Sequence, residues 1–592
     1  MEKDIYITST HFSHRHTPVF FILSLLCLAG CLSVAAQPTS FRDELVLSTP
    51  ELNTDVPFSP EPKRSRLVYT GEDGRLVYRP YSDRGDIIPD FSGVGYRKGE
   101  RELPTVPVRV TLAPSVDDSD DTARIQQAID AVGAMPPDVD GFRGAVLLQR
   151  GRYRVGDTLI IRESGVVLRG EGSCENGTIL YADAPRRYNV ISVGRPTGSR
   201  QEVEGTRQKV IDAYVPVGSR TLTVADGSPF SVSDTVVVGR PATQEWIDMI
   251  GMGPDGDMAR RGGQPWLPEE YTFSFEREIV AVDGNSIVLD IPLVQSLDQD
   301  FGGGFVYRYI FPERIQDIGV EHLRIVSAFD RSQTGTLSGR NLEGPGDPAR
   351  HGEVFYSDGE HARNAVAMDM VEHAWVRNVA AQWFSYAAVT ISRRSAHVTV
   401  IDCAYLDGAG PVSGGQRYAF NISGQKNLVR DSYAFRARHS FVLSARVPGP
   451  NVFYNCRADE AILMSEPHHR WATGVLFDNI KHYGGSLWAV NRGTSGTGHG
   501  WSGAQIIFWN CTAALIAVQS PPMAENFAIG LGGTPDRRPI DLTWLRRQSG
   551  EELPKRPETP AHGSGHIEHP HNPVEPPSLY LRQLEERMSA KQ

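Results

Sequence analysis

The sequence predicts an all-β solenoid in which short parallel strands stack coil upon coil. Three observations predict this fold: a short pattern around Asn or Asp recurs through the C-terminal half, Gly-punctuated strand segments precede the repeat, and an amphipathic helix precedes those strands. At 592 residues the chain exceeds a typical single domain, but a solenoid lengthens by adding similar layers. Apolar residues at 40% and charged residues at 22% exclude a wholly disordered, collagenous or coiled-coil protein.

The recurrent pattern sets the length of one coil. Six segments share an apolar start, an Asn or Asp three residues later and then a small or apolar residue: WVRNVAAQWF, VTVIDCAYLD, LVRDSYAF, VFYNCRADEA, LFDNIKHYG and IIFWNCTAAL. Their Asn and Asp residues are 24, 29, 24, 24 and 31 residues apart, which suits one coil of a parallel β-solenoid with loops of variable length. The residues taken as equivalent are Asn378, Asp402, Asp431, Asn455, Asn479 and Asn510.

Three cysteines support this alignment of the coils. Cys403, Cys456 and Cys511 each follow the equivalent Asn or Asp directly. We therefore predict one internal stack of small thiols on successive coils, about 4.8 Å apart. A metal site is a poorer interpretation, because metal ligands converge from several directions and these residues form a single row.

The helix and strands before the repeat predict how the solenoid begins. Residues 120–132 have an acidic start and apolar residues at i, i+3, i+4 and i+7, which predicts a capped amphipathic helix over the open end. Strands are predicted at 144–155, 158–172 and 178–182, each punctuated by Gly.

In the order DDTARIQQAID, GAVLLQRGRYRV and GVVLRGEG, these segments resemble the opening of the pectate-lyase-like superfamily of right-handed parallel β-helices. The resemblance covers residues 106–195, with the helix and first coils, and 311–530, the main β-helix. It implies a right-handed parallel β-helix and an action on polysaccharides, as for many members. It does not select a reaction, because the superfamily includes lyases, hydrolases, epimerases and phage adhesins.

Three further segments differ in character from the coils. Residues 196–310 contain strand pairs that turn at a DGN triplet, which predicts a small β-rich subdomain inserted into an early coil. Residues 37–105, rich in Pro and Asp, predict an extended lead-in. Residues 531–592 are Pro-rich and include HGSGHIEHPH and SLYLRQLEERM, which predicts an exposed tail with a short helix.

The first 36 residues predict an export signal. Lys3 and Arg15 precede the eleven-residue apolar run of residues 19–29, which is too short to span a bilayer as a helix. Two processing sites compete: a lipoprotein box ending at Cys31, which we favour, and a small-residue site at 34–36. The sequence thus predicts an exported monomer that is either a periplasmic or outer-membrane lipoprotein with a lipid anchor or a secreted protein.

The charge distribution predicts the kind of ligand. A net charge of −11 argues against a nucleic-acid partner. Residues 436–501 nevertheless carry a net charge of +3 and five histidines. This concentration predicts an anionic ligand, and for an exported β-helix we expect an acidic, uronic-acid-containing polysaccharide or oligosaccharide.

The basic segment contains the groups that β-elimination requires. A base must remove the proton α to the uronate carboxylate, while a cation neutralises that carboxylate and an acid protonates the leaving oxygen. We assign the base to His468 or His469, carboxylate neutralisation to Arg470 and Arg492, and the acid to His499 or Tyr418. His468 and Arg492 each lie 13 residues after an equivalent Asn, which predicts that they are neighbours on adjacent coils.

The predicted substrate-binding residues surround these groups, with Trp501 as a sugar-stacking platform: Tyr418, Arg438, His439, Trp471, Asn491 and Trp501. A purely structural interpretation stands beside this one. In it, His469 and Trp471 pack inside their coil while Arg470 pairs with Asp478.

Two other functions remain open. A glycoside hydrolase needs two carboxylates about 5 to 9.5 Å apart, and Asp358, Glu360, Glu466 and Asp478 are available. Polygalacturonase relatives carry an Asn-Thr-Asp segment and an Asp-Asp pair on successive coils, and neither occurs within the predicted main β-helix, residues 311–530. A non-catalytic glycan-binding or adhesion protein is the third function. No cofactor and no metal site is predicted with certainty; Ca²⁺ is the one ion considered, at residues 356–361, where the oxygen ligands are too few for a complete site.

Overall fold

The computed structural model of the chain describes residues 61–338, 350–531 and 561–590. The predicted export signal, Cys31 and the start of the lead-in lie outside the described residues. Within the described ranges, no helix has both the length and the apolar character that crossing a membrane requires.

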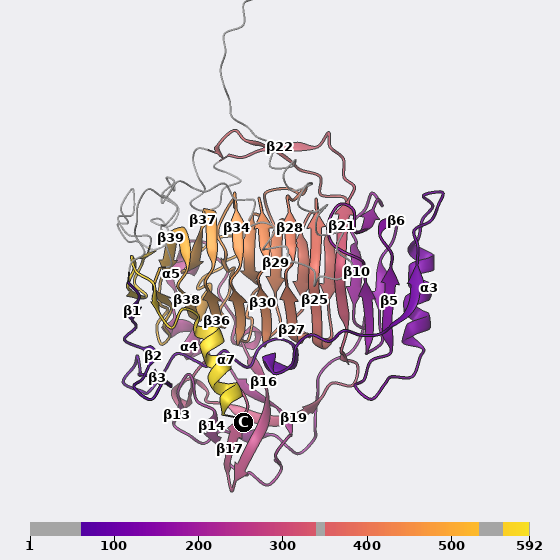
Figure 1. Cartoon of the computed structure of the whole chain (residues 1–592). Helices are drawn as coiled ribbons and strands as arrows, with labels where there is room; N and C mark the ends of the chain where they lie inside the picture. The colour runs from indigo at the N-terminus through magenta and orange to yellow at the C-terminus, as the bar shows by residue number, and fades with distance from the viewer. Residues whose placement is uncertain (1–60, 339–349, 532–560, 591–592) are drawn as a thin grey trace, which may run out of the picture.

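The described chain folds as a right-handed parallel β-helix with three faces (Figure 1). The first face contains β4 (Val108–Leu112), β5 (Gly144–Leu148), β8 (Val166–Arg169), β20 (Ile315–Gln316), β27 (Ala396–Ile401), β30 (Asn427–Arg430), β33 (Asn451–Tyr454), β36 (Ala472–Asp478), β38 (Gly503–Trp509), β40 (Phe527–Ile529) and β42 (His566–Glu568). The second contains β6 (Gly151–Val155), β9 (Thr178–Ala182), β28 (Ala404–Leu406), β31 (Tyr433–Phe435), β34 (Arg457–Asp459), β37 (Lys481–Ala489), β39 (Thr512–Val518) and β41 (Ala561–His562). β21 (Gly319–Ser327) and β25 (Val371–Gln382) bend across both faces.

The third face is a separate sheet of seven parallel strands. It contains β7 (Leu159–Ile161), β10 (Asn189–Val193), β24 (Asn364–Met368), β26 (Ala387–Ile391), β29 (Tyr418–Ile422), β32 (His439–Leu443) and β35 (Glu466–Pro467). Apolar side chains from all three faces form one continuous core that runs the length of the solenoid.

The repeated Asn and Asp residues form the corner between the first and second faces. All six adopt φ between 49° and 57°, the left-handed region that Asn and Asp tolerate better than other non-glycine residues. The predicted alignment of coils is thus confirmed, and its physical basis is the corner conformation. His322 (φ 58°) lies opposite Asn378 and forms the same corner one coil earlier, where the sequence pattern did not reveal it.

The cysteines face the core, but the prediction of thiols on successive coils is wrong. Cys403, Cys456 and Cys511 are at most 1% exposed. The strand pairing places Ser432 between the first two and Ile480 between the last two. The position faces the interior beside a corner, so any small or apolar side chain fits it, and the thiols lie on alternate coils.

Helix α3 (Thr122–Gly133) closes the N-terminal end of the solenoid, as predicted (Figure 1). Ile125, Ile129 and Val132 on its apolar side are at most 2% exposed and belong to the continuous core. The helix therefore shields the first coil from water and from pairing with another chain.

Residues 201–310 form an antiparallel β subdomain between β10 and β20 (Figure 1, below the solenoid). Its strands are β11 (Gln201–Glu202), β12 (Gln208–Lys209), β13 (Tyr214–Val215), β14 (Thr221–Thr223), β15 (Thr235–Arg240), β16 (Phe273–Asp283), β17 (Ser286–Leu289), β18 (Leu297–Asp298) and β19 (Phe305–Ile310), with helices α4 (Gln244–Met249) and α5 (Asp257–Arg260). Its apolar core includes Trp471 and Ala504 of the solenoid, so the two parts share one packed interface.

The described segments before and after the coils, residues 61–99 and 561–590, pack against the solenoid. β1 (Lys63–Arg64) pairs with β43 (Val574–Glu575), β2 (Val68–Thr70) pairs with β3 (Leu76–Tyr78), and the backbone N–H of Tyr96 donates to Thr399 Oγ1 at 2.8 Å. Helix α7 (Leu579–Ser589) buries Leu579 and Tyr580. The prediction of an exposed tail is therefore wrong for residues 561–590, because β42 continues the first face and α7 packs on it.

Candidate active site

Side chains from four successive coils meet near the C-terminal end of the third face of the solenoid. Tyr418 begins β29, His439 begins β32, and Glu466 lies in β35 just before His468 and His469. Arg492 and His499 lie on the loop between β37 and β38. The predicted proximity of His468 and Arg492 is confirmed by a distance of 2.9 Å between His468 Nδ1 and Arg492 Nη1.

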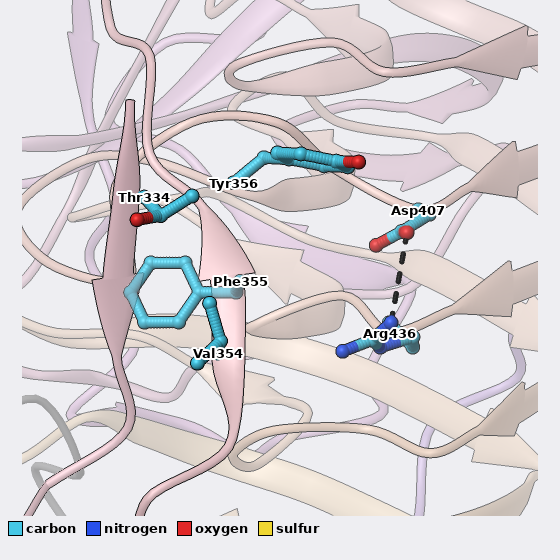
Figure 2. Close-up of a pocket in the computed structure, with 6 residues that line it drawn as sticks. All are labelled: Thr334, Val354, Phe355, Tyr356, Asp407 and Arg436. Carbon is cyan, nitrogen blue, oxygen red and sulfur yellow. Dashed lines mark ion pairs between the residues drawn. The ribbon is translucent and has the colours of Figure 1, made fainter. Parts of the chain in front are cut away.

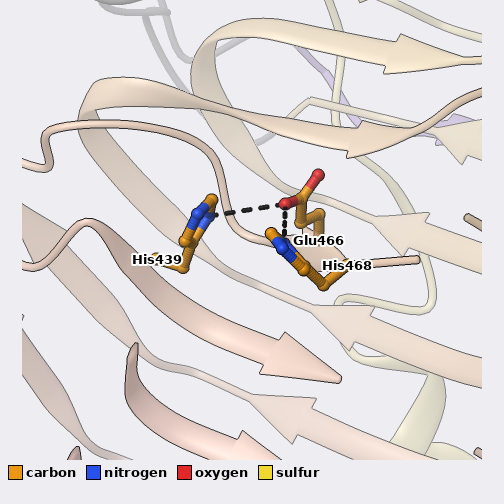
Figure 3. Close-up of side chains that lie close together, drawn as sticks. All are labelled: His439, Glu466 and His468. Atoms are coloured by element: carbon orange, nitrogen blue, oxygen red, sulfur yellow. Dashed lines mark hydrogen bonds and ion pairs between the residues drawn. The ribbon is translucent and has the colours of Figure 1, made fainter. Parts of the chain in front are cut away.

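Tyr418, His468 and Glu466 form a hydrogen-bonded line. His468 Nδ1 lies 2.6 Å from Glu466 Oε1, and His468 Nε2 lies 2.9 Å from the Tyr418 hydroxyl. We assign the imidazole proton to Nδ1, because a carboxylate accepts and does not donate. The Tyr418 hydroxyl then donates to Nε2. Figure 3 shows one carboxylate oxygen of Glu466 contacting both the His468 and the His439 rings, and His439 Nδ1 lies 3.4 Å from this oxygen.

Arg492 holds this line in place from within the protein. Its Nη1 donates to Glu466 Oε1 at 2.8 Å and to the carbonyl oxygen of His468 at 2.7 Å. Both Arg492 and Glu466 are 0% exposed. The prediction that Arg492 neutralises a substrate carboxylate is therefore wrong, because its guanidinium is enclosed and already paired with a carboxylate.

Three of these side chains also place possible metal ligands close together. One ligand atom from each of His439, Glu466 and His468 lies within 4.8 Å of the others. The Arg492 guanidinium occupies the space beside two of these atoms, and His439 Nδ1 donates to the carbonyl oxygen of Met464 at 2.9 Å. A buried cation at this position opposes a second cation by Coulomb repulsion, so this donor set does not suit a metal ion.

The clustered histidines are uncharged at neutral pH. Burial, reinforced by the charge of Arg492, holds the pKa of His468 well below its usual range and lowers the pKa of His469 to about 3 and that of His499 to about 2. The three rings lie 4.9 to 5.2 Å apart between centroids. Each imidazole can therefore accept one proton and donate another, as a general acid or base must.

A cationic rim flanks these neutral rings. Arg446 and Arg470 lie 3.8 and 3.9 Å from the same carboxylate oxygen of Glu270, which belongs to the inserted subdomain. Arg470 also donates to the carbonyl oxygen of Thr497 at 3.2 Å and thus does not pair with Asp478. With two guanidinium groups to one carboxylate, this rim attracts an anionic ligand.

Other predicted substrate-binding residues have structural roles. Trp471 is 1% exposed and packs edge-on against Trp246, with ring centroids 4.9 Å apart, and Trp501 Nε1 donates to the carbonyl oxygen of Ile250 at 2.9 Å. The prediction of Trp471 as a substrate-binding residue is wrong, because the inserted subdomain covers it. Arg438 is 2% exposed and donates to the carbonyl oxygen of Gly414, which places it under the surface.

His439 is 0% exposed and can contact a substrate only through its neighbours. Asn491 accepts from the N–H of Gly493 at 2.9 Å and shapes the loop that carries Arg492. These two predicted binding residues support the site from behind.

The four carboxylates proposed for hydrolysis bond to different parts of the molecule. Asp358 accepts from the N–H groups of Asp330 and Glu360, and Glu360 pairs with Arg187 at 2.7 Å. Asp478 is 0% exposed and accepts from Ser578 and the N–H of Tyr580; burial raises its pKa to about 7. Glu466 is enclosed with Arg492. Their enclosure argues against Glu466 and Asp478 as an acid and base for a bound substrate, and the pairing of Asp358 with Glu360 stays a prediction.

The sequence did not single out two residues beside Tyr418. The Tyr386 ring lies 5.2 Å from that of Tyr418, and its hydroxyl accepts from Asn421 Nδ2 at 2.8 Å. The strand register could have located Asn421, because it places this residue on the third face, opposite Thr390 and Val442 on the neighbouring coils. The contribution of Glu270 from the inserted subdomain has no signal in the repeat.

Comparisons with known proteins give only distant likenesses. No protein-family profile matches the sequence, and no curated protein matches it. Among solved structures, the tailspike of Acinetobacter baumannii bacteriophage AP22, in complex with a capsular saccharide, is 9% identical and has a TM-score of 0.31, covering 76% of this chain and 67% of that chain. The tailspike protein gp49 of Pseudomonas phage LKA1 is 13% identical with a TM-score of 0.31, covering 70% and 61%. The tailspike of E. coli bacteriophage HK620, in complex with a pentasaccharide, is 10% identical with a TM-score of 0.35, covering 76% and 62%. The chain thus spans about two thirds or less of the length of these proteins, and likenesses of this size say nothing about its activity.

Proposed function

We propose that the protein is a carbohydrate-active enzyme that cleaves an acidic polysaccharide by β-elimination. The observation that supports this proposal is the line from Tyr418 through His468 to Glu466, beside a cationic rim and neutral histidines. A phenol linked to a neutral imidazole can exchange a proton with a bound sugar. The buried carboxylate stabilises the imidazolium that forms when His468 takes that proton.

In this mechanism Tyr418 Oη removes the proton α to the uronate carboxylate while its own proton passes to His468 Nε2. The Nδ1 proton of His468 remains on the side of Glu466, as the 2.6 Å contact requires. Arg470 is the cation that neutralises the substrate carboxylate, and His469 or His499 protonates the leaving oxygen. Arg492 and Glu466 act as positioning residues.

An anionic substrate also raises the pKa values of His469 and His499 and so makes these histidines better proton acceptors. The charges of Arg492 and Arg470 contribute to the low pKa values of His469 and His499. A carboxylate bound among these cations offsets part of that effect and moves the histidine pKa values toward neutrality. The same cations that attract the substrate thus leave the histidines uncharged until it binds.

The test incubates the purified protein with acidic and neutral polysaccharides and records two signals: ultraviolet absorbance of the unsaturated uronate product, and new reducing ends. We expect both signals to rise together on an acidic polymer. Tyr418→Phe should lower the rate by about 10² to 10⁴-fold, whereas Tyr181→Phe, which changes a tyrosine in β9, serves as the matched control.

The two signals separate the alternative functions. Reducing ends without absorbance would refute elimination and indicate a hydrolase. Binding of an acidic polymer without either signal, unchanged in Tyr418→Phe, would indicate a glycan-binding protein. Arg470→Gln tests the cationic rim, and Arg260→Gln, at an exposed arginine, is its control. If elimination takes place at this site, Arg470→Gln raises KM and Arg260→Gln leaves it unchanged.

A further inference from the structure

A pocket with a volume of about 300 Å³ lies between Thr334 and residues 354–356 on one side and the side chains of Asp407 and Arg436 on the other. One wall is the hairpin of β22 (Thr334–Thr336) and β23 (Val354–Tyr356). Figure 2 shows Thr334, Val354 and Phe355 on this hairpin, facing Asp407 and Arg436. The volume is at the small end of the range for ligand pockets, about 300 to 1,000 Å³, which limits the occupant to a small ring-sized group.

The polar wall is a ladder of corner residues on consecutive coils. Trp383, Asp407, Arg436 and Glu460 each follow the last residue of the second face and lie opposite one another in the strand register. All four adopt φ between 47° and 63°, the left-handed conformation that the solenoid also uses at its other corners.

Charges around this pocket are balanced. Arg436 lies 3.7 Å from Asp407 and 3.8 Å from Glu460, and it also pairs with Glu353. Glu353 pairs in turn with Arg350 at 2.7 Å. Arg417, buried below, lies 4.0 Å from Asp407. This balance differs from the cationic rim at Arg446 and Arg470, so the pocket favours an uncharged ligand.

The remaining lining fits a sugar ring. Phe355 and Tyr356 offer aromatic surfaces to the apolar side of a ring. Asp407 accepts hydrogen bonds and the Arg436 guanidinium donates them, so together they match neighbouring hydroxyl groups that both donate and accept. We propose that this pocket binds a neutral pyranose unit of a glycan.

The pocket and the proposed active site are linked through adjacent residues. Arg417 Nη2 donates to the carbonyl oxygen of Tyr356 at 2.7 Å, while its chain neighbour Tyr418 bonds to His468. Binding in the pocket itself does not depend on elimination at Tyr418.

The test uses Val354, which lines the pocket and is 63% exposed. Val354→Trp fills the pocket from its edge without disturbing the core, and Val232→Trp, at a valine that is 58% exposed in the inserted subdomain, is the matched control. Asp407→Asn keeps the side-chain shape and removes the charge. The probes are the methyl glycosides of glucose, galactose and mannose, N-acetylglucosamine, and glucuronic acid, followed by saturation-transfer NMR and calorimetry.

We expect at least one neutral probe to bind with a dissociation constant on the order of 1 mM. Val354→Trp and Asp407→Asn should each weaken it by about tenfold or more, while Val232→Trp and Tyr418→Phe leave it unchanged. The proposal is overturned if no neutral probe binds, if binding persists in Val354→Trp, or if glucuronic acid alone binds in the pocket. Because Tyr418→Phe leaves pocket binding intact, failure of the pocket and failure of elimination are separate outcomes.

Discussion

Replacing Arg492 by Met tests the arrangement of the active site most directly. Met has a similar length and no charge, so the substitution removes the guanidinium and preserves most of the side-chain volume. The change deprives Glu466 Oε1 of its 2.8 Å contact and the carbonyl oxygen of His468 of its 2.7 Å contact. Both members of this pair are 0% exposed, so water cannot replace what is lost.

The expected cost follows from this enclosure. Removing one partner of a buried ion pair typically destabilises a protein by about 3 to 5 kcal/mol, because the remaining charge stays desolvated. Replacing both partners is far less costly. We therefore expect Arg492→Met to lower the local opening free energy by about 3 to 5 kcal/mol, and Glu466→Gln combined with Arg492→Met to recover at least half of that loss.

Hydrogen exchange of intact protein, read by mass spectrometry on peptides that cover residues 461–471, measures local opening directly. Peptides that cover α3 at the far end of the solenoid provide an internal reference. A large effect on both regions would indicate global unfolding and would call for the milder Arg492→Lys, which keeps the charge.

Two results would refute the reasoning. A cost below about 1 kcal/mol for Arg492→Met would show that Glu466 is solvated or already protonated. A double variant that is less stable than Arg492→Met would show that the carboxylate, and not the pairing, stabilises the loop.

Three further predictions concern pH, the corners and the interface. Burial lowers the pKa of His469 to about 3, so between pH 6.5 and 3 the unfolded state binds the extra proton and the free energy of unfolding falls as the pH falls. At pH 5 this loss amounts to about 2 kcal/mol. His469→Gln should remove it from a pH series of unfolding measurements, and an unchanged pH slope in this variant would contradict the assignment. Asn455 has φ 53° and donates to Asp431. In denaturant unfolding, Asn455→Ala should lower the free energy of unfolding by about 1 to 2 kcal/mol more than Asn455→Gly does. Equal losses in the two variants would argue against a left-handed corner. Trp471→Ala should destabilise by about 3 to 5 kcal/mol and loosen the inserted subdomain, detected as faster proteolysis within residues 244–271; unaltered proteolysis would mean that Trp471 does not anchor the subdomain.

The fold was predictable because its physical requirements repeat. Every coil needs a left-handed corner, and Asn or Asp recurs there at intervals that the sequence shows directly. The corner at His322 escaped notice because a less common residue takes the same conformation. The sequence pattern also did not predict that the thiols alternate with Ser432 and Ile480. An interior position restricts the size and polarity of a side chain but does not require one residue type.

The proposed active site was predictable in composition but only partly in role. Basic residues and histidines concentrated in one segment indicated the candidate site, and coil spacing correctly placed His468 beside Arg492. Whether each side chain is buried or accessible to a substrate depends on tertiary contacts. The inserted subdomain, whose sequence has no coil period, covers Trp471 and supplies Glu270 to the cationic rim.

Stability alone does not explain why these groups lie together. A buried Glu466–Arg492 pair is no more stabilising than apolar side chains of the same volume, and histidines with low pKa values weaken the fold as the pH falls. Elsewhere in the described solenoid, apolar side chains form most of the interior, and buried groups such as His397 and Lys426 are more scattered. Three uncharged imidazoles, a tyrosine and a buried ion pair in one contact network lower the stability of the fold. Proton transfer at this site explains why they lie together, because an enclosed carboxylate can hold His468 in a single tautomer directed at Tyr418.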